Sequence, residues 1–351
     1  MIKQKGFALV LVLWVLSLLT IMAGSFALSM RREAAIVTGS SNNAQAMAVA
    51  ESGLAIAEFM LLNPDQQQRW RTDGSIYQID YADSRVRIRL LSETGKIDLN
   101  SADQALLQGL MTYAPVDEEL QTKLVSAILD WRDADDLVNI EGAEKEEYED
   151  AGLSYHPRNK PFESIEELQM VLGMNEQVFK WLEKLVTIYS GQSKPDMTQA
   201  AEEVLRVLPE MDAGLIDGYI TARRESAING LPAPAFPAGS NLGMTSGQNS
   251  AAVNDGASRQ GTGFAVENTP VTSANQGAGQ EGATEVVTEA LLDDGTTAMI
   301  KVLIKKLDSG TESSPFQVLK WQRNAVGDGS LFTDEKEDLL VRQYGEPEFN
   351  N

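Results

Sequence analysis

An uncharged apolar run occupies the beginning of the chain, over residues 7–30. Its 24 residues would form a helix of about 36 Å at about 1.5 Å per residue, enough to cross the hydrocarbon core of a bilayer. A cleaved secretory signal peptide is the competing interpretation, with small residues at positions 23–25 as one cleavage site. The apolar part of such a peptide is usually only about 7–15 residues long. The run therefore predicts one membrane-spanning helix over residues 7–30.

The charge balance limits the partners that the chain can bind. It has 29 basic and 51 acidic residues and a formal net charge of −22. This sign repels phosphate backbones, so nucleic acid is not expected as a partner, while surplus carboxylates favour a divalent cation such as calcium. There is no cysteine, which excludes disulfides, thiolate metal sites and cysteine nucleophiles.

Periodicity divides the rest of the chain. Small and apolar side chains recur at helical spacing as far as Pro64, so the first helix is expected to continue through residue 62. Residues 75–80 and 85–91 predict a hairpin, and residues 101–225 predict a helical region with weak helix-turn-helix repeats, in which residues 178–188 form one helix.

The C-terminal part begins with a segment poor in apolar residues, over 226–282, which is expected to be disordered. Strands are expected at 284–292, 297–306 and 316–322, followed by an acidic, frayed end. The resulting division is 1–6, 7–62, 63–98, 99–225, 226–283, 284–325 and an acidic tail over 326–351. Because strands far apart in sequence must share one sheet, the fold class is predicted to be α+β, with the helical region as an insertion.

The first residues resemble those of type IV prepilins. A short basic leader ends in Gly6, and the aromatic Phe7 opens the apolar run. The resemblance implies that prepilin peptidase cuts between Gly6 and Phe7, that Phe7 becomes N-methylated, and that the chain spans the inner membrane once with its C-terminal domain in the periplasm. Most pilins carry Glu at the fifth mature position, whereas this chain has Leu11.

The departure at Leu11 is typical of the K-type minor pseudopilins of type II secretion, which have no subunit above them to pair with. Further motifs carry the same resemblance: residues 96–100, 130–136, 142–144, 157–161 and 318–321, with Tyr148. It implies a type IV pilin-like fold, with a long transmembrane helix, an antiparallel sheet and a large inserted helical domain. It also implies a place at the tip of the pseudopilus, beside the I- and J-type minor pseudopilins, that supports export of folded proteins across the outer membrane.

The densest polar cluster lies between residues 133 and 144. In EF-hand counting Asp133 would be position 1 and Glu144 position 12, but Leu137 and Val138 occupy places that need a polar ligand and a glycine. Clustered carboxylates still suit calcium, and the resembled family binds calcium. We therefore take Asp133, Asp136 and Glu144 as candidate calcium ligands, against the alternative of a solvated acidic loop.

Two other function classes were compared with this hypothesis. Residues 97–102 and the leucines after them also resemble helix-hairpin-helix DNA binders, so a competence or type IV pilus subunit that contacts DNA is the alternative. The turns of this chain, however, lack the paired glycines of helix-hairpin-helix proteins, and the residues around them are acidic. An enzyme is not expected, because the single histidine, His156, has no evident nucleophilic partner.

Overall fold

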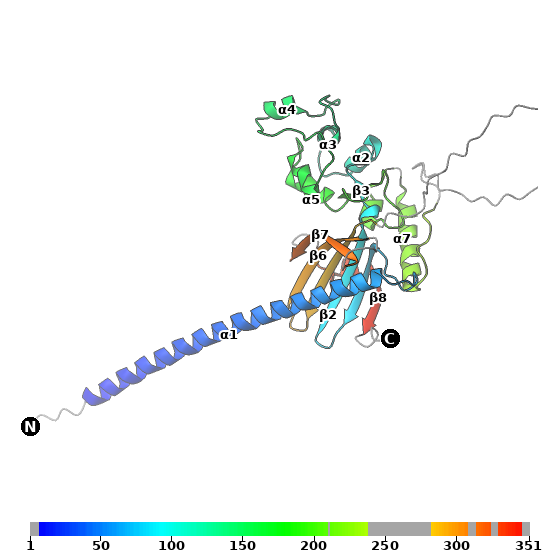
Figure 1. Cartoon of the computed structure of the whole chain (residues 1–351). Coiled ribbons are helices and arrows are strands. Elements are labelled where there is room, and N and C mark those ends of the chain that lie inside the picture. Colours follow the sequence, from blue (N-terminus) through cyan, green and yellow to red (C-terminus); the bar gives the residue numbers. More distant parts are fainter. Residues whose placement is uncertain (1–6, 210, 238–281, 308–313, 324–328, 346–351) are drawn as a thin grey trace, which may run out of the picture.

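The computed structural model describes residues 7–209, 211–237, 282–307, 314–323 and 329–345. A single long helix, α1 (Phe7–Leu61), runs from the sheet outward to the N-terminal end (Figure 1). Among the described residues, α1 is the one helix that is long and apolar enough to cross a membrane. Its apolar window is not buried within the chain, so the first half of α1 has the length, composition and exposure that membrane-spanning helices have.

The second half of α1 packs on the sheet through small side chains. Ala46, Ala50 and Ala57 are fully buried there. At Gly53 a β-carbon would lie 2.9 Å from Cγ2 of Val86, so the helix backbone approaches the strands as closely as glycine permits. The Thr288 hydroxyl on the sheet donates a 2.9 Å hydrogen bond to the carbonyl oxygen of Ala50, which fixes the helix along its axis.

Six strands form the main sheet, in the order β7-β6-β5-β2-β1-β8. The strands are β1 (Asp73–Asp80), β2 (Ser84–Ser92), β5 (Thr284–Leu292), β6 (Thr297–Lys306), β7 (Phe316–Arg323) and β8 (Leu340–Gly345). All neighbours are antiparallel except β1 and β8. In the centre, β2 pairs with β5 from Ser84↔Leu292 to Ser92↔Thr284. Strands separated by the whole helical region therefore lie side by side, and the α+β fold class is confirmed.

Residues 97–228, here called the helical block, follow β2. Most of the block lies at one end of the sheet, while its last helix, residues 213–228, lies beside the sheet near β8 (Figure 1). Its helices are α2 (Gln104–Met111), α3 (Glu118–Arg132), α4 (Lys145–Asp150), the 3-10 helix η2 (Ile165–Met170), α5 (Glu176–Leu182), α6 (Glu202–Leu205) and α7 (Ala213–Ile228). Aspartates cap three of them: the side chains of Asp103, Asp117 and Asp212 accept from backbone N–H groups in the first turns of α2, α3 and α7.

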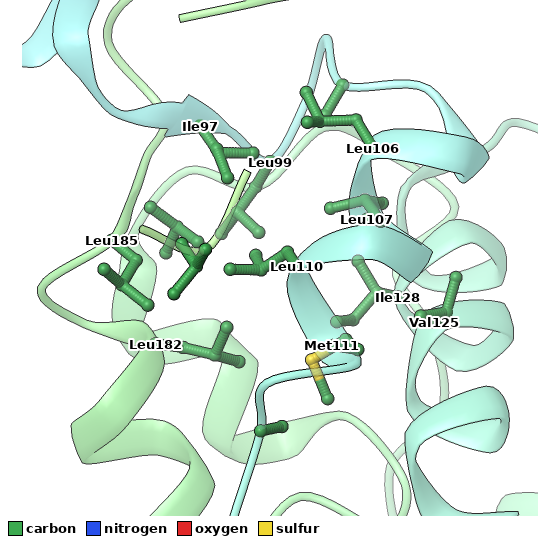
Figure 2. Packing of buried hydrophobic residues seen from close by; sticks show 14 of the residues in the cluster. Ile97, Leu99, Leu106, Leu107, Leu110, Met111, Val125, Ile128, Leu182 and Leu185 are labelled. Carbon is green, nitrogen blue, oxygen red and sulfur yellow. The ribbon is translucent and has the colours of Figure 1, made fainter. Parts of the chain in front are cut away.

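The helical block has its own apolar core, separate from the core between α1 and the sheet. Figure 2 shows Met111 of α2 beside Ile128 of α3, whereas Leu110 of α2 points to the other side, toward Leu99. The two helices therefore pack against each other within the core of the helical block.

The helical block also contains a small sheet that the sequence reading missed. Strand β3 (Ile97–Asp98) pairs in parallel with β4 (Val186–Thr187). The helix expected over 178–188 is wrong in its second half, because α5 ends at Leu182 and the β-branched Val186–Thr187 pair extends instead. Helix α7 continues to Ile228, three residues past the expected end of the helical region at 225.

The expectation of a frayed end over residues 326–351 is wrong for the residues that the structure describes. Residues 329–345, here called the C-terminal segment, hold the short helix α8 (Asp334–Glu337) and strand β8, which adds to the sheet beside β1. Leu331, Val341 and Tyr344 are buried, so three apolar anchors outweigh the acidic composition. Leu331 packs with Ile76 and Val287 on the sheet face opposite α1, here called the far face.

Some of the expected segments cannot be compared with the structure. The leader over 1–6 and residues 238–281 of the expected disordered segment lie outside the described residues. Within that segment, residues 229–237 are described and contain neither helix nor strand.

Candidate functional site: a bare helix and an acidic loop

The exposed part of α1 is the first candidate site. The first turn of the helix contains no acidic residue, and the side chain of Leu11 is 53% exposed. The apolar side chains that follow as far as Met30 are also exposed. A bare apolar helix of this length needs lipid or other apolar helices around it. Gly6 lies outside the described residues, so the predicted cleavage site stays a prediction.

The second candidate site is the loop between α3 and α4, which Asp130 organises. This fully buried carboxylate accepts hydrogen bonds from the backbone N–H of Asn139 at 3.2 Å and of Ala143 at 2.7 Å. The carbonyl oxygen of Ile140 accepts from the Ser126 hydroxyl at 2.9 Å. A β-carbon on Gly142 would lie 1.9 Å from Oδ2 of Asp130. Glycine is therefore required where the loop closes over the carboxylate.

Three side-chain oxygens in the loop and after α4 are buried without a hydrogen-bond partner. They belong to Asp133 (Oδ1), Glu144 (Oε1) and Asn159 (Oδ1). Glu144 is only 6% exposed. Asp136 is exposed, and its Oδ1 accepts a 2.7 Å hydrogen bond from Nδ2 of Asn159. Asp133 and Asp136 thus lie near enough to Glu144 for their charges to act on it, and Asn159 contacts Asp136.

The electrostatics of the loop are those of crowded carboxylates. Burial, together with the charges of Asp130 and Asp133, raises the pKa of Glu144 to about 7. Burial and the neighbouring Asp135 also raise the pKa of Asp133 above its ordinary value. Buried oxygens that lack donors and repel one another are stabilised by a bound cation.

The donor set suits calcium better than a smaller or softer metal. Calcium takes 6–8 oxygen ligands and accepts amide and carbonyl oxygens as readily as carboxylates. Among the described residues, however, no three Asp, Glu or His side chains are placed to hold a metal ion by themselves. Any ion would also need Asn159, backbone carbonyls or water, so calcium binding stays a prediction.

Two residues that contact this loop were not selected from the sequence. Asp130 lies on the buried face of α3 between Ala127 and Trp131, and an acid on an otherwise apolar face is the signal that could have identified it. Asn159 has a φ of 52°, in the left-handed region that Asn tolerates. Because Asn159 lies in the segment 157–161, after α4, the sequence does not indicate its contact with Asp136.

Comparison with known proteins places this loop inside a recognised region. Residues 84–191 match the family model described as type II secretion system (T2SS), protein K. No curated protein matches the chain. Among solved structures, it is similar to GspK in the crystal structure of the GspK-GspI-GspJ complex from the enterotoxigenic Escherichia coli type 2 secretion system. That alignment has 14% identity, covers 84% of this chain and 98% of that chain, and has a TM-score of 0.39. Over residues 84–191, the chain is therefore similar to protein K of type II secretion systems.

Proposed function

We propose that this chain is the minor pseudopilin at the tip of the type II secretion pseudopilus and that it acts by assembly, not catalysis. The observation that carries the proposal is α1, whose second half is buried on the sheet while its first half is bare and apolar. Such a helix can be held by the inner membrane before assembly and by neighbouring helices after it. The sheet and the helical block then lie in the periplasm.

The start of α1 supports the tip position. In a shaft subunit, a Glu at the fifth mature position neutralises the N-terminus of a neighbouring subunit. Leu11 offers no such charge, so this subunit can end a filament but is a poor partner within one. We propose the I- and J-type minor pseudopilins as its neighbours and export of folded proteins across the outer membrane as the process that the tip supports.

The mature N-terminus tests the proposal. Prepilin peptidase is expected to cut between Gly6 and Phe7 and leave an N-methylated Phe7, which mass spectrometry of the purified full-length protein would detect. The variant Gly6→Val, which keeps the apolar run intact, is expected to remain uncut. A chain that begins at Met1, or after Ala23 as a signal peptide would leave it, contradicts the proposal.

We further propose that Asp133, Asp136 and Glu144 hold calcium together with Asn159. The three unpartnered buried oxygens support this site. Bound calcium would neutralise the carboxylates and tie the loop to residue 159, so it should stabilise the folded chain by mass action.

Calcium removal is therefore expected to lower the melting temperature of the protein by several degrees, as measured by differential scanning fluorimetry in detergent. Asp133→Ala should abolish the difference between calcium and chelator. Asp150→Ala removes an exposed carboxylate at the end of α4 and should preserve it. Equal melting temperatures with and without calcium in the unmodified protein would disprove the site.

A further inference from the structure

A small cavity of about 80 Å³ lies where three parts of the chain meet: the far face of the sheet, the helical block and the C-terminal segment. Five cationic side chains line it: Arg89, Lys96, Lys184, Lys301 and Lys336. The acids in its lining are Glu203 and Glu285. In a chain with a net charge of −22, this concentration of positive charge is unusual.

Two of the cations are neutralised within the fold. Lys96 Nζ lies 2.7 Å from Glu93 Oε1 and 3.2 Å from Glu285 Oε2. Lys301 Nζ lies 3.2 Å from the other oxygen of Glu285. Glu93, Lys96, Glu285 and Lys301 thus form a balanced cluster, here called the junction cluster, which joins the sheet to the start of the helical block.

The other pairings place two cations on one carboxylate. Glu203 is shared between Arg89, 3.3 Å away, and Lys336, 3.5 Å away. Charge-assisted hydrogen bonds between such groups are usually about 2.7–2.9 Å long. Two cations therefore make long contacts with one carboxylate, and the side chain of Arg89 is only 12% exposed to compensating solvent.

The pKa of Glu203 reflects the same positive environment. Burial alone would raise this pKa, but the charge of Arg89, a backbone hydrogen bond and the charge of Lys336 outweigh the effect and lower it to about 2. A negative group placed in this cavity would meet the same attraction.

We propose that the cavity binds one small oxyanion of the phosphate or sulfate class, with Arg89 and Lys336 as its charged donors. Arginine presents a planar fork to such oxygens, and lysine provides a mobile point charge. The cavity of about 80 Å³ has room for several water-sized groups, so a small tetrahedral anion fits. A bound anion would link β2, on which Arg89 lies, to α8, on which Lys336 lies, and so hold the C-terminal segment against the far face.

The test measures thermal unfolding of the full-length protein in detergent and calcium-free buffer. Inorganic phosphate and sulfate are each compared with chloride at equal ionic strength, and acetate serves as a carboxylate arm. Phosphate at about 10 mM is expected to raise the melting temperature by about 2–4 °C over chloride. Titration calorimetry should give one site for each chain.

Lys336→Met keeps most of the aliphatic stem and removes the charge, so it should weaken phosphate binding at least tenfold. Lys305→Met, at an exposed lysine of β6 that does not line the cavity, should leave binding unchanged. The proposal is overturned if phosphate acts no differently from chloride on the unmodified protein, if both variants lose the response equally, or if acetate stabilises as much as phosphate. The comparison in the unmodified protein decides the matter even if Lys336→Met does not fold.

Discussion

At the scale of single residues, Gly142 allows the acidic loop to close over the Asp130 carboxylate. We expect Gly142→Ala to destabilise the protein by about 2 kcal/mol, because the new β-carbon would displace the Asp130 carboxylate and leave buried N–H groups without acceptors. Urea denaturation of the purified protein would measure this loss.

The control for Gly142→Ala is Gly218→Ala in α7, where a β-carbon would have no neighbour within 4 Å. Alanine is a better helix former than glycine by about 0.8–1 kcal/mol, so this variant should gain stability. An equal loss of stability in both variants would mean that the contact between Gly142 and Asp130 does not limit the residue at position 142. Sequence spacing found the candidate ligands Asp133, Asp136 and Glu144, but Asp130 and Asn159 contribute through tertiary contacts that no local pattern encodes.

At the scale of elements, the junction cluster makes the attachment of the sheet to the helical block sensitive to pH. Burial would raise the pKa of Glu285, but Lys96 and Lys301 outweigh it and lower the pKa to about 2. Because the folded pKa is below the unfolded value of about 4.5, the stabilisation is complete above pH 4.5 and is lost as the pH falls toward 2. Glu285→Gln should therefore cost about 3 kcal/mol at pH 7 and flatten the decline in unfolding free energy between pH 4.5 and 2.

Glu176→Gln serves as the matched control, since Glu176 forms an exposed pair with Lys180 on one helix, and such pairs contribute little. Its pH profile should follow that of the unmodified protein, and the same profile for Glu285→Gln would contradict the role of the junction cluster.

Elements with a strong local period could be predicted from the sequence, whereas those fixed by distant partners could not. The long apolar run of α1 and the apolar runs of β5 and β6 are enough to predict a helix and two strands. Strand β8 is short and follows an acidic stretch, and it is stable only because β1, more than 250 positions earlier in the chain, offers a parallel edge. The strand pair β3 and β4 depends in the same way on a distant partner.

At the scale of the whole molecule, the net charge favours the proposed secretion subunit over a DNA-binding pilus subunit, the alternative that the paired helices suggest. Two amphipathic helices joined by a short turn can present N–H groups to phosphate, but this chain carries a net charge of −22 and repels a polyanion at distances up to a Debye length, roughly 30 Å at 0.01 M salt. The full-length protein should therefore show no binding to a labelled duplex in fluorescence anisotropy at 10 mM salt. Binding that weakens steeply with added salt would support the DNA-binding function instead, because such dependence reports the release of counterions from the phosphate backbone.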